Sequence, residues 1–304
     1  MKGKDEPELM GTSSIPAPFS EAELKLLQVL VYQECGMYFD ERRTHFLQDR
    51  LQRRLKECHL DSFYSYYRLL ISKEGKNELA RLLENLTVNE TSFFRNKAQL
   101  DLFHKHVLDE LIRRKQAQRD YSLRIWSAGC STGEEPYSIA VSLCQSLKFA
   151  EAWEIEILAT DISRRALRHA ERGVYSKRSL QDVSLGQVET YFTAMKHGFQ
   201  VKPRIRRMIS FAQMNLIESV YVGKFDCIFC MNVLMYFSDE RRITILRRFY
   251  DALEPGGYFL LGHSETLSNV PMKFESIVLG DCRIYRKPVA AEAQRAPALV
   301  EGSL

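Results

Sequence analysis

The segment SAGCSTGEEPYS, residues 127–138, contains two overlapping patterns that would support different chemistry. Taken as GCSTG, residues 129–133, it matches the G-x-S-x-G turn that presents a nucleophilic serine in many hydrolases. Taken as a glycine-containing turn followed by two acids, it is typical of a loop that holds a nucleotide-like cofactor close to the backbone. The residues that follow in the chain must distinguish the two.

The hydrolase interpretation needs an acid and then a histidine after Ser131, and Asp226 and His263 occur in that order. However, no HGGG-like oxyanion loop precedes the turn. The interpretation also leaves Asp161 without a role. It therefore remains the weaker alternative.

The cofactor interpretation gives Asp161 a function. This acid ends the strand-like run EIEILATD, where a carboxylate can accept hydrogen bonds from both hydroxyls of a ribose. We expect the glycine turn to approach the cofactor through backbone N–H groups. Glu134 and Glu135 begin the next helix, where they would repel a pyrophosphate and attract a cation. S-adenosylmethionine carries a ribose, a sulfonium and an ammonium but no phosphate, so the loop favours it over NAD.

The surrounding periodicity predicts how these residues are positioned. From Ser20 to about Arg119 the pattern is helical, with Leu47, Leu51 and Leu55 on one apolar face. From Leu123 onward, strand-like runs alternate with helix-like ones, which predicts βαβ units and a parallel sheet.

The expected fold class is α/β: a Rossmann-like, S-adenosylmethionine-dependent methyltransferase sheet domain with a small inserted β-subdomain, preceded by an all-helical N-terminal domain. The expected parts are a flexible arm (1–18), a helical domain (19–90), a linker helix (91–120), the cofactor-binding domain (121–288, with the insertion at 174–210) and a flexible tail (289–304). Within the insertion, a hairpin is expected around His197-Gly198.

The composition is that of an ordinary globular protein, with 304 residues, 45% hydrophobic, 27% charged and a net charge of +4. This charge is too small to indicate nucleic acid, and no run is long and apolar enough for a secretion signal or membrane insertion. The seven cysteines are scattered, which favours a reducing, cytoplasmic location. Cys227 and Cys230 lie in a strand-like run, so we expect a buried core position and no metal.

Several segments together resemble the chemotaxis receptor methyltransferases, the CheR family. They are LTVNETSFFRN, RIWSAGCSTGEEPYSIA, ATDIS, NVLMYF and GYFLLGHSETL, and the resemblance extends from about Phe19 to Pro288. It implies methylation of glutamate side chains on the helical bundle of chemoreceptors, giving glutamate methyl esters and S-adenosylhomocysteine for sensory adaptation. A non-catalytic signalling module that binds S-adenosylmethionine on the same fold is the alternative.

The same resemblance implies the roles of individual residues. The expected cofactor contacts are Asn89, Thr91, Arg95, Glu135, Asp161, Asn215, Leu216 and Asn232, with Gly129 in the glycine turn and Met231 beside Asn232. Many family members have arginine at the position of Met231, so only a backbone contact is expected there. Arg95 and Tyr236 match the pair that the family places near the transferred methyl. We expect Arg95 to orient the substrate carboxylate and Tyr236 to pack beside the methyl.

The implied partner is an acidic helical bundle. A basic helix from Asp40 to Glu57 could dock on it through Arg42, Arg43, Arg50, Arg53 and Arg54. A second basic cluster, Lys202, Arg204, Arg206 and Arg207, is a further candidate contact. The segment YFTAMKHGFQVKP lacks the longer loop of members that tether to a receptor's C-terminal pentapeptide, so no such tether is expected.

Overall fold

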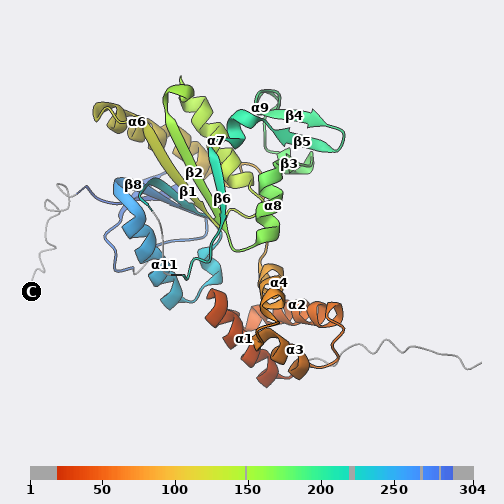
Figure 1. Ribbon diagram of the computed structural model, residues 1–304. Coiled ribbons are helices and arrows are strands. Elements are labelled where there is room, and N and C mark those ends of the chain that lie inside the picture. The colour runs from red at the N-terminus through yellow and green to blue at the C-terminus, as the bar shows by residue number, and fades with distance from the viewer. Residues whose placement is uncertain (1–18, 148, 219–222, 268–269, 281, 290–304) are drawn as a thin grey trace, which may run out of the picture. The chain divides into compact units, whose positions relative to one another are not determined.

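The structure, a computed structural model, describes residues 19–147, 149–218, 223–267, 270–280 and 282–289 (Figure 1). The expected arm, and the expected tail beyond Val289, lie outside these residues. The chain forms two compact units: residues up to Val31 together with Phe39–Leu86, and Tyr32–Tyr38 together with the chain from Thr87. Residues 87–120, where we expected a domain end and a linker, thus belong to the same unit as the sheet.

The first unit is helical. It contains most of α1 (Glu21–Cys35), the short η1 (Glu41–Arg43), α2 (Thr44–Glu57), α3 (Phe63–Ile71) and α4 (Lys76–Leu86). Asp40 and Ser62 start their helices by accepting hydrogen bonds from the backbone N–H groups of Arg43 (3.1 Å) and Ser65 (3.2 Å). The apolar face predicted for α2 is fully buried.

The expected basic docking face of α2 needs one correction. Arg54 is only 6% exposed, and its Nε donates to Glu78 Oε1 at 2.9 Å. Tyr66 Oη donates to the same oxygen at 2.9 Å. Arg54 therefore neutralises a buried carboxylate inside the helical unit and is not available to a partner, whereas Arg42 and Arg53 are exposed.

The second unit is built on a seven-stranded sheet with the order β6-β2-β1-β7-β8-β10-β9. Its strands are β1 (Ser122–Ala128), β2 (Glu154–Asp161), β6 (Ile209–Gln213), β7 (Phe225–Cys230), β8 (Leu253–Leu261), β9 (Glu275–Leu279) and β10 (Cys282–Arg286). The first five strands in this order are parallel to one another, and β10 is antiparallel to both of its neighbours, β8 and β9. The predicted α/β class with a parallel core is confirmed. The strand order changes direction at β1, which is where open α/β sheets bind ligands.

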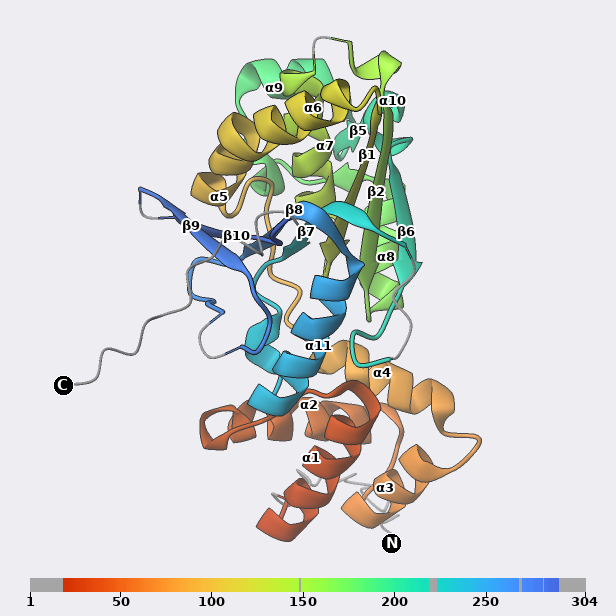
Figure 2. The same cartoon turned by 90° about the vertical axis from the view of Figure 1, so that its left-hand side faces the viewer.

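Helices cover both faces of this sheet (Figure 2). They are α5 (Lys97–Leu102), the π-helical η2 (Phe103–Val107), α6 (Leu108–Ala117), α7 (Glu134–Ser146), α8 (Arg164–Arg172) and α11 (Asp239–Ala252). Successive strand residues face opposite cores: Ile125 packs in the core that includes residues of α6 and α7, and Trp126 in the core with α11. Short 3₁₀ segments lie at η3 (Ala150–Ala152), η4 (Arg178–Leu180) and η5 (Leu234–Tyr236).

The insertion forms a small antiparallel sheet with the order β3-β5-β4. Its elements are β3 (Val174–Tyr175), α9 (Leu185–Tyr191), β4 (Phe192–Met195), β5 (Gly198–Val201) and α10 (Pro203–Arg206). The strands β4 and β5 pair directly up to Met195 and Gly198, as the expected hairpin requires. The next strand, β6, already belongs to the main sheet.

The two closely spaced cysteines behave as core residues. Cys227 and Cys230 are both 0% exposed, and neither forms a disulfide. Within the described ranges, no cluster of three or more His, Cys, Asp or Glu side chains could hold a metal ion. No helix in the same ranges has both the length and the apolar composition that crossing a membrane demands.

Candidate functional site

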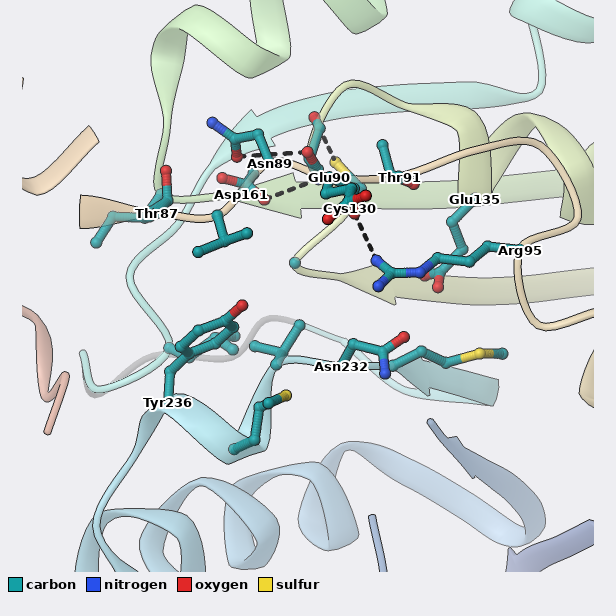
Figure 3. Close-up of a pocket in the computed structure, with 18 of the residues that line it drawn as sticks. Thr87, Asn89, Glu90, Thr91, Arg95, Cys130, Glu135, Asp161, Asn232 and Tyr236 are labelled. Carbon is teal, nitrogen blue, oxygen red and sulfur yellow. Dashed lines mark hydrogen bonds between the residues drawn. The ribbon is translucent and has the colours of Figure 1, made fainter. Parts of the chain in front are cut away.

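A cavity of about 440 Å³ lies at the carboxyl ends of the five parallel strands. The structure brings every site residue proposed from the sequence into its lining: Asn89, Thr91, Arg95, Gly129, Glu135, Asp161, Asn215, Leu216, Met231, Asn232 and Tyr236. They come from the loops that follow β1, β2, β6 and β7 and from the segment before α5. Figure 3 shows Tyr236 across the cavity from Asp161 and Asn89.

The glycine turn after β1 is held by its own hydrogen bonds. The N–H groups of Gly129 and Cys130 both donate to the carbonyl of Thr160, at 2.8 and 2.9 Å. Ser131 N donates to Asp161 Oδ2 at 2.8 Å. The expectation that these N–H groups face a cofactor is therefore wrong, and the turn offers little to a phosphate.

Gly129 has a left-handed backbone (φ +83°), and a Cβ there would lie 2.4 Å from Val233 Cγ2. A side chain at this position would force the loop after β7 to move. The glycine therefore lets two loops of the cavity wall approach each other closely.

The serine hydrolase interpretation is wrong. Asp226 stands at the beginning of β7, where its carboxylate accepts a hydrogen bond from Arg124 N (3.0 Å) and pairs with Lys115 Nζ (3.1 Å). Ser131 follows the carboxyl end of the adjacent parallel strand β1, whereas Asp226 lies near the amino end of β7. The two side chains are therefore at opposite ends of these strands. His263 is exposed and does not line the cavity.

Two acids begin α7, but only Glu135 lines the cavity. Glu134 is 4% exposed and instead accepts a hydrogen bond from Thr132 Oγ1 at 2.6 Å. The expectation that both acids face a cofactor is therefore wrong for Glu134.

Glu135 accepts a hydrogen bond from Ser127 Oγ at 2.7 Å. Enclosure by protein raises its pKa to about 7, and the negative charge of Glu265 adds to this, whereas Ser127 and Arg95 act in the opposite direction. An acid that is costly to ionise in the free protein is a favourable partner for a cationic ligand.

Arg95 lies beside Glu135 in Figure 3, and its guanidinium donates to the carbonyl of Glu90. The preceding residues fix the position of this arginine. Phe93 is 0% exposed and packs edge-on against Tyr175 with the ring centroids 4.9 Å apart, as expected of a packing residue. Phe94 has a left-handed backbone, and its N–H donates to Ser138 Oγ at 3.0 Å.

Glu265, which no sequence motif indicated, also lines the cavity. Its Oε2 accepts hydrogen bonds from Asn232 N (2.7 Å) and Gly262 N (3.0 Å), and its Oε1 accepts one from Met235 N (3.2 Å). One carboxylate thus holds the loop after β7, where Asn232 has the left-handed φ of 60°.

Asn96 contacts Met231, the residue that stands where many family members are expected to have arginine. Its Nδ2 lies 3.0 Å from Met231 Sδ and donates to Asn232 Oδ1 at 3.2 Å. Met231 is only 6% exposed, so its thioether forms part of the wall of the cavity.

The segment Tyr32–Tyr38 also contributes to the cavity, through Cys35 and Met37. It is held by hydrogen bonds from Tyr38 N to the carbonyl of Tyr236 (2.8 Å) and from Asn215 Nδ2 to the carbonyl of Glu34 (2.8 Å). Both bonds use backbone carbonyls, so they leave no signal in the sequence.

Comparison with known proteins identifies the family. Residues 89–280 match the model of the CheR methyltransferase, SAM binding domain, and residues 22–87 match that of the CheR methyltransferase, all-alpha domain. Chemotaxis protein methyltransferase 2 of Vibrio cholerae is 37% identical over 84% of this chain and 90% of its own length. The chemotaxis protein methyltransferase of Salmonella typhimurium is 35% identical over 84% of this chain and 87% of its own. Chemotaxis protein methyltransferase 1 of Pseudomonas aeruginosa is 34% identical over 88% and 98%. These matches cover both structural units, and the chain belongs to the CheR methyltransferase family.

Proposed function

We propose that this protein transfers the methyl group of S-adenosylmethionine to glutamate side chains of chemoreceptors in the cytoplasm. The products would be glutamate 5-O-methyl esters and S-adenosylhomocysteine, and the modification would serve sensory adaptation. The observation that carries the proposal is the pair of carboxylates, Asp161 and Glu135, that line a single cavity whose glycine turn has few free donors for a phosphate.

The cavity fits this cofactor in its chemistry. Asp161 would accept from the ribose, since its carboxylate is already oriented by the N–H groups of Ser131 and Ser163 at 2.8 Å each. Glu135 would face the ammonium, and Asn215, Leu216, Met231 and Asn232 would surround the adenine. When bound, S-adenosylmethionine supplies an activated methyl group on a positively charged sulfur. No metal is needed for this chemistry.

The chain's own contribution is positioning. A glutamate carboxylate is already ionised near neutral pH, with an ordinary pKa of about 4.3, so no general base is required. Arg95 would hold the incoming carboxylate at the cavity, and Tyr236 would pack beside the reacting methyl and exclude water. Holding reactants in line in this way can contribute roughly 7–11 kcal/mol at best.

Methyl transfer to membranes that bear chemoreceptors tests the proposal directly. With radiolabelled S-adenosylmethionine, we expect label on the receptor that is released by mild base, as methyl esters are, and none on receptors whose methylated glutamates are replaced by alanine. Binding of S-adenosylhomocysteine without any transfer would instead support a non-catalytic signalling module. Absence of both would contradict the cofactor assignment as well.

Docking on the receptor is a second part of the proposal. The exposed Arg42 of η1 and Arg53 of α2, with the half-buried Arg43 and Arg50, remain candidates for contact with an acidic helical bundle. The turn between β4 and β5 consists only of Lys196 and His197, which supports methylation without a pentapeptide tether.

The raised pKa of Glu135 predicts a pH dependence for cofactor binding. Only the ionised carboxylate attracts an ammonium, and the free protein ionises Glu135 at about pH 7. We therefore expect the affinity for S-adenosylhomocysteine, measured by calorimetry, to fall by up to about tenfold per pH unit as the pH decreases below about 7. The protein carrying Glu135→Gln should bind weakly and with little pH dependence in this range. A constant affinity of the unmodified protein from pH 5 to 8 would show that Glu135 does not contact the ammonium.

The same shift affects the stability of the free protein with the opposite sign. The unfolded chain ionises Glu135 near its ordinary pKa of 4.5, whereas the folded protein does so near 7. Between these values the folded state binds more protons, so this group makes folding less favourable as the pH rises. Bound cofactor that keeps Glu135 ionised should abolish this trend, which thermal unfolding at several pH values with and without S-adenosylhomocysteine would show.

A further inference from the structure

The exposed surface of α8 is almost entirely arginine. The helix buries Ala166, Leu167 and Ala170 against the sheet unit. Its exposed residues are Arg164, Arg165, Arg168, Glu171 and Arg172. Because Arg164, Arg168 and Arg172 recur every four residues, they form a stripe about 12 Å long on one side of the helix.

Glu171 is the one acid on the exposed surface of α8, against four arginines. Among the described residues, no ion pair involves Arg164, Arg168 or Arg172. Arg164 Nε donates only to the neutral amide of Gln213. Like charges four residues apart on a helix repel each other, so the arrangement weakens the helix that carries it. An ordinary solvated helix face alternates acids and bases instead.

The stripe continues onto the insertion. Arg206 Nη2 donates to the carbonyl of Glu171 at 2.8 Å, which places α10 against the carboxyl end of α8. Arg206 and Arg207 line a shallow cleft there together with Glu171 and Phe211. In Figure 1, α8 leads toward the small sheet of the insertion.

The other end of the stripe lies at the cofactor cavity. Ile162 lines that cavity, and Arg164 follows two residues later, within about 7 Å of chain. Ser163 fixes the start of the helix by accepting a hydrogen bond from Ala166 N at 3.2 Å. A substrate glutamate that enters the cavity would therefore have its neighbouring residues close to the first arginine.

We propose that the arginines of α8, continued by Arg206 and Arg207, form a docking surface for the glutamate-rich receptor helix whose side chains are methylated. The proposal rests on the function proposed above and is separate from the basic face of α2. A helix with acids at four-residue spacing matches the pitch of the stripe. Such a contact would orient the receptor helix relative to the cavity, and it would weaken with salt.

The test uses Arg168→Glu combined with Arg172→Glu in the full chain. Neither residue lines the cavity, so S-adenosylhomocysteine affinity should be unchanged. The matched control is Arg113→Glu combined with Lys273→Glu, which alters the net charge equally at two exposed sites on α6 and before β9. Arg168→Gln with Arg172→Gln provides a milder variant with less risk to folding.

The substrate is a soluble cytoplasmic receptor fragment, with both its binding and its methylation measured. At about 0.02 M salt we expect the double glutamate variant to bind the fragment, and to methylate it, about tenfold less well than the unmodified protein or the control. At about 0.5 M salt the difference should shrink to about twofold or less.

The possible outcomes distinguish failure of the docking surface from failure of the proposed reaction. Equal binding and methylation at low salt would show that the stripe is only a solvated face. A defect seen only with receptors in anionic lipid vesicles would assign the stripe to the membrane. If the unmodified protein binds the fragment through the stripe without methylating it, the docking surface stands and the proposed reaction fails. If the double glutamate variant methylates the fragment as fast as the unmodified protein does, only the docking surface is ruled out.

Discussion

Replacing Arg95 by alanine is expected to lower the rate of methyl transfer by about 100- to 1000-fold, while S-adenosylhomocysteine affinity changes by less than about tenfold. Arg95 lines the cavity beside Glu135 and is anchored through the carbonyl of Glu90. We propose that its guanidinium holds the substrate carboxylate. This carboxylate is present during methyl transfer but absent when S-adenosylhomocysteine binds to the protein alone. Its loss should therefore affect turnover far more than cofactor binding.

The loss of Arg95 could also act indirectly, through the ionisation of Glu135, and the experiment must separate this effect from a loss of substrate binding. Arg95 lowers the pKa of Glu135, so its removal would leave less of that carboxylate ionised near neutral pH. Measuring both rate and affinity at about pH 8.5 keeps Glu135 ionised in each protein. Under these conditions a loss of turnover reports on the substrate carboxylate.

Arg95→Lys is the informative control. Lysine keeps the charge but not the planar pair of donors that matches a carboxylate. We expect it to restore part of the rate lost in the alanine variant. Equal losses of affinity and turnover in Arg95→Ala would assign Arg95 to cofactor binding alone.

The sequence predicted the parallel sheet and most of the cavity for a single physical reason. Polar residues such as Asp161 and Asn232 each follow a strand-like run, and the carboxyl ends of parallel strands meet at one edge. The order of strands and helices therefore brings together residues that are far apart in the chain. No knowledge of side-chain contacts was needed for this step.

Residues whose role depends on a single distant partner were not predictable. The burial of Arg54 does follow from helical spacing, because Arg54 comes seven residues after Leu47 and three after Leu51 and so lies on their apolar side, but the partner that neutralises it does not. Its buried partner Glu78 belongs to another helix, and no local pattern connects the two. Similarly, the turn around Gly129 was recognised, but the use of its N–H groups by Thr160 was not.

Glu265 is the most important cavity residue that the sequence did not predict. It binds backbone N–H groups, which nearly every residue has, so no side-chain pattern marks its partners. Its carboxylate accepts three such bonds, from Asn232, Met235 and Gly262. Hydrogen bonds to a charged acceptor are worth about 1.5–3 kcal/mol each and are not additive. The left-handed Asn232 is held in place by these bonds, so Glu265 positions one wall of the cavity without having to touch the reacting atoms.

Glu265→Ala is accordingly expected to weaken S-adenosylhomocysteine binding by about 100-fold, equivalent to about 2.8 kcal/mol, and to lower turnover with it. Hydrogen exchange of the amides of Asn232 and Met235 should become faster, because the loop after β7 loses its acceptors. Glu265→Gln, which keeps one acceptor oxygen but presents an NH₂ group to the remaining N–H, should show an intermediate loss. Ser264→Ala, at the adjacent cavity residue, should bind as the unmodified protein does.

The charge of Glu265 acts on a cationic ligand in two opposite ways, because it attracts the ligand directly and also hinders the ionisation of Glu135. Glu265 raises the pKa of Glu135, so its removal makes Glu135 easier to ionise and should favour a cationic ligand near neutral pH. A gain in affinity, with unchanged exchange at Asn232, would mean that the loop holds its shape without the carboxylate and that Glu265 acts only through its charge. A loss of affinity accompanied by faster exchange at Asn232 would assign the effect to the loop, because a change of charge alone leaves the hydrogen bonds of the Asn232 amide unopened.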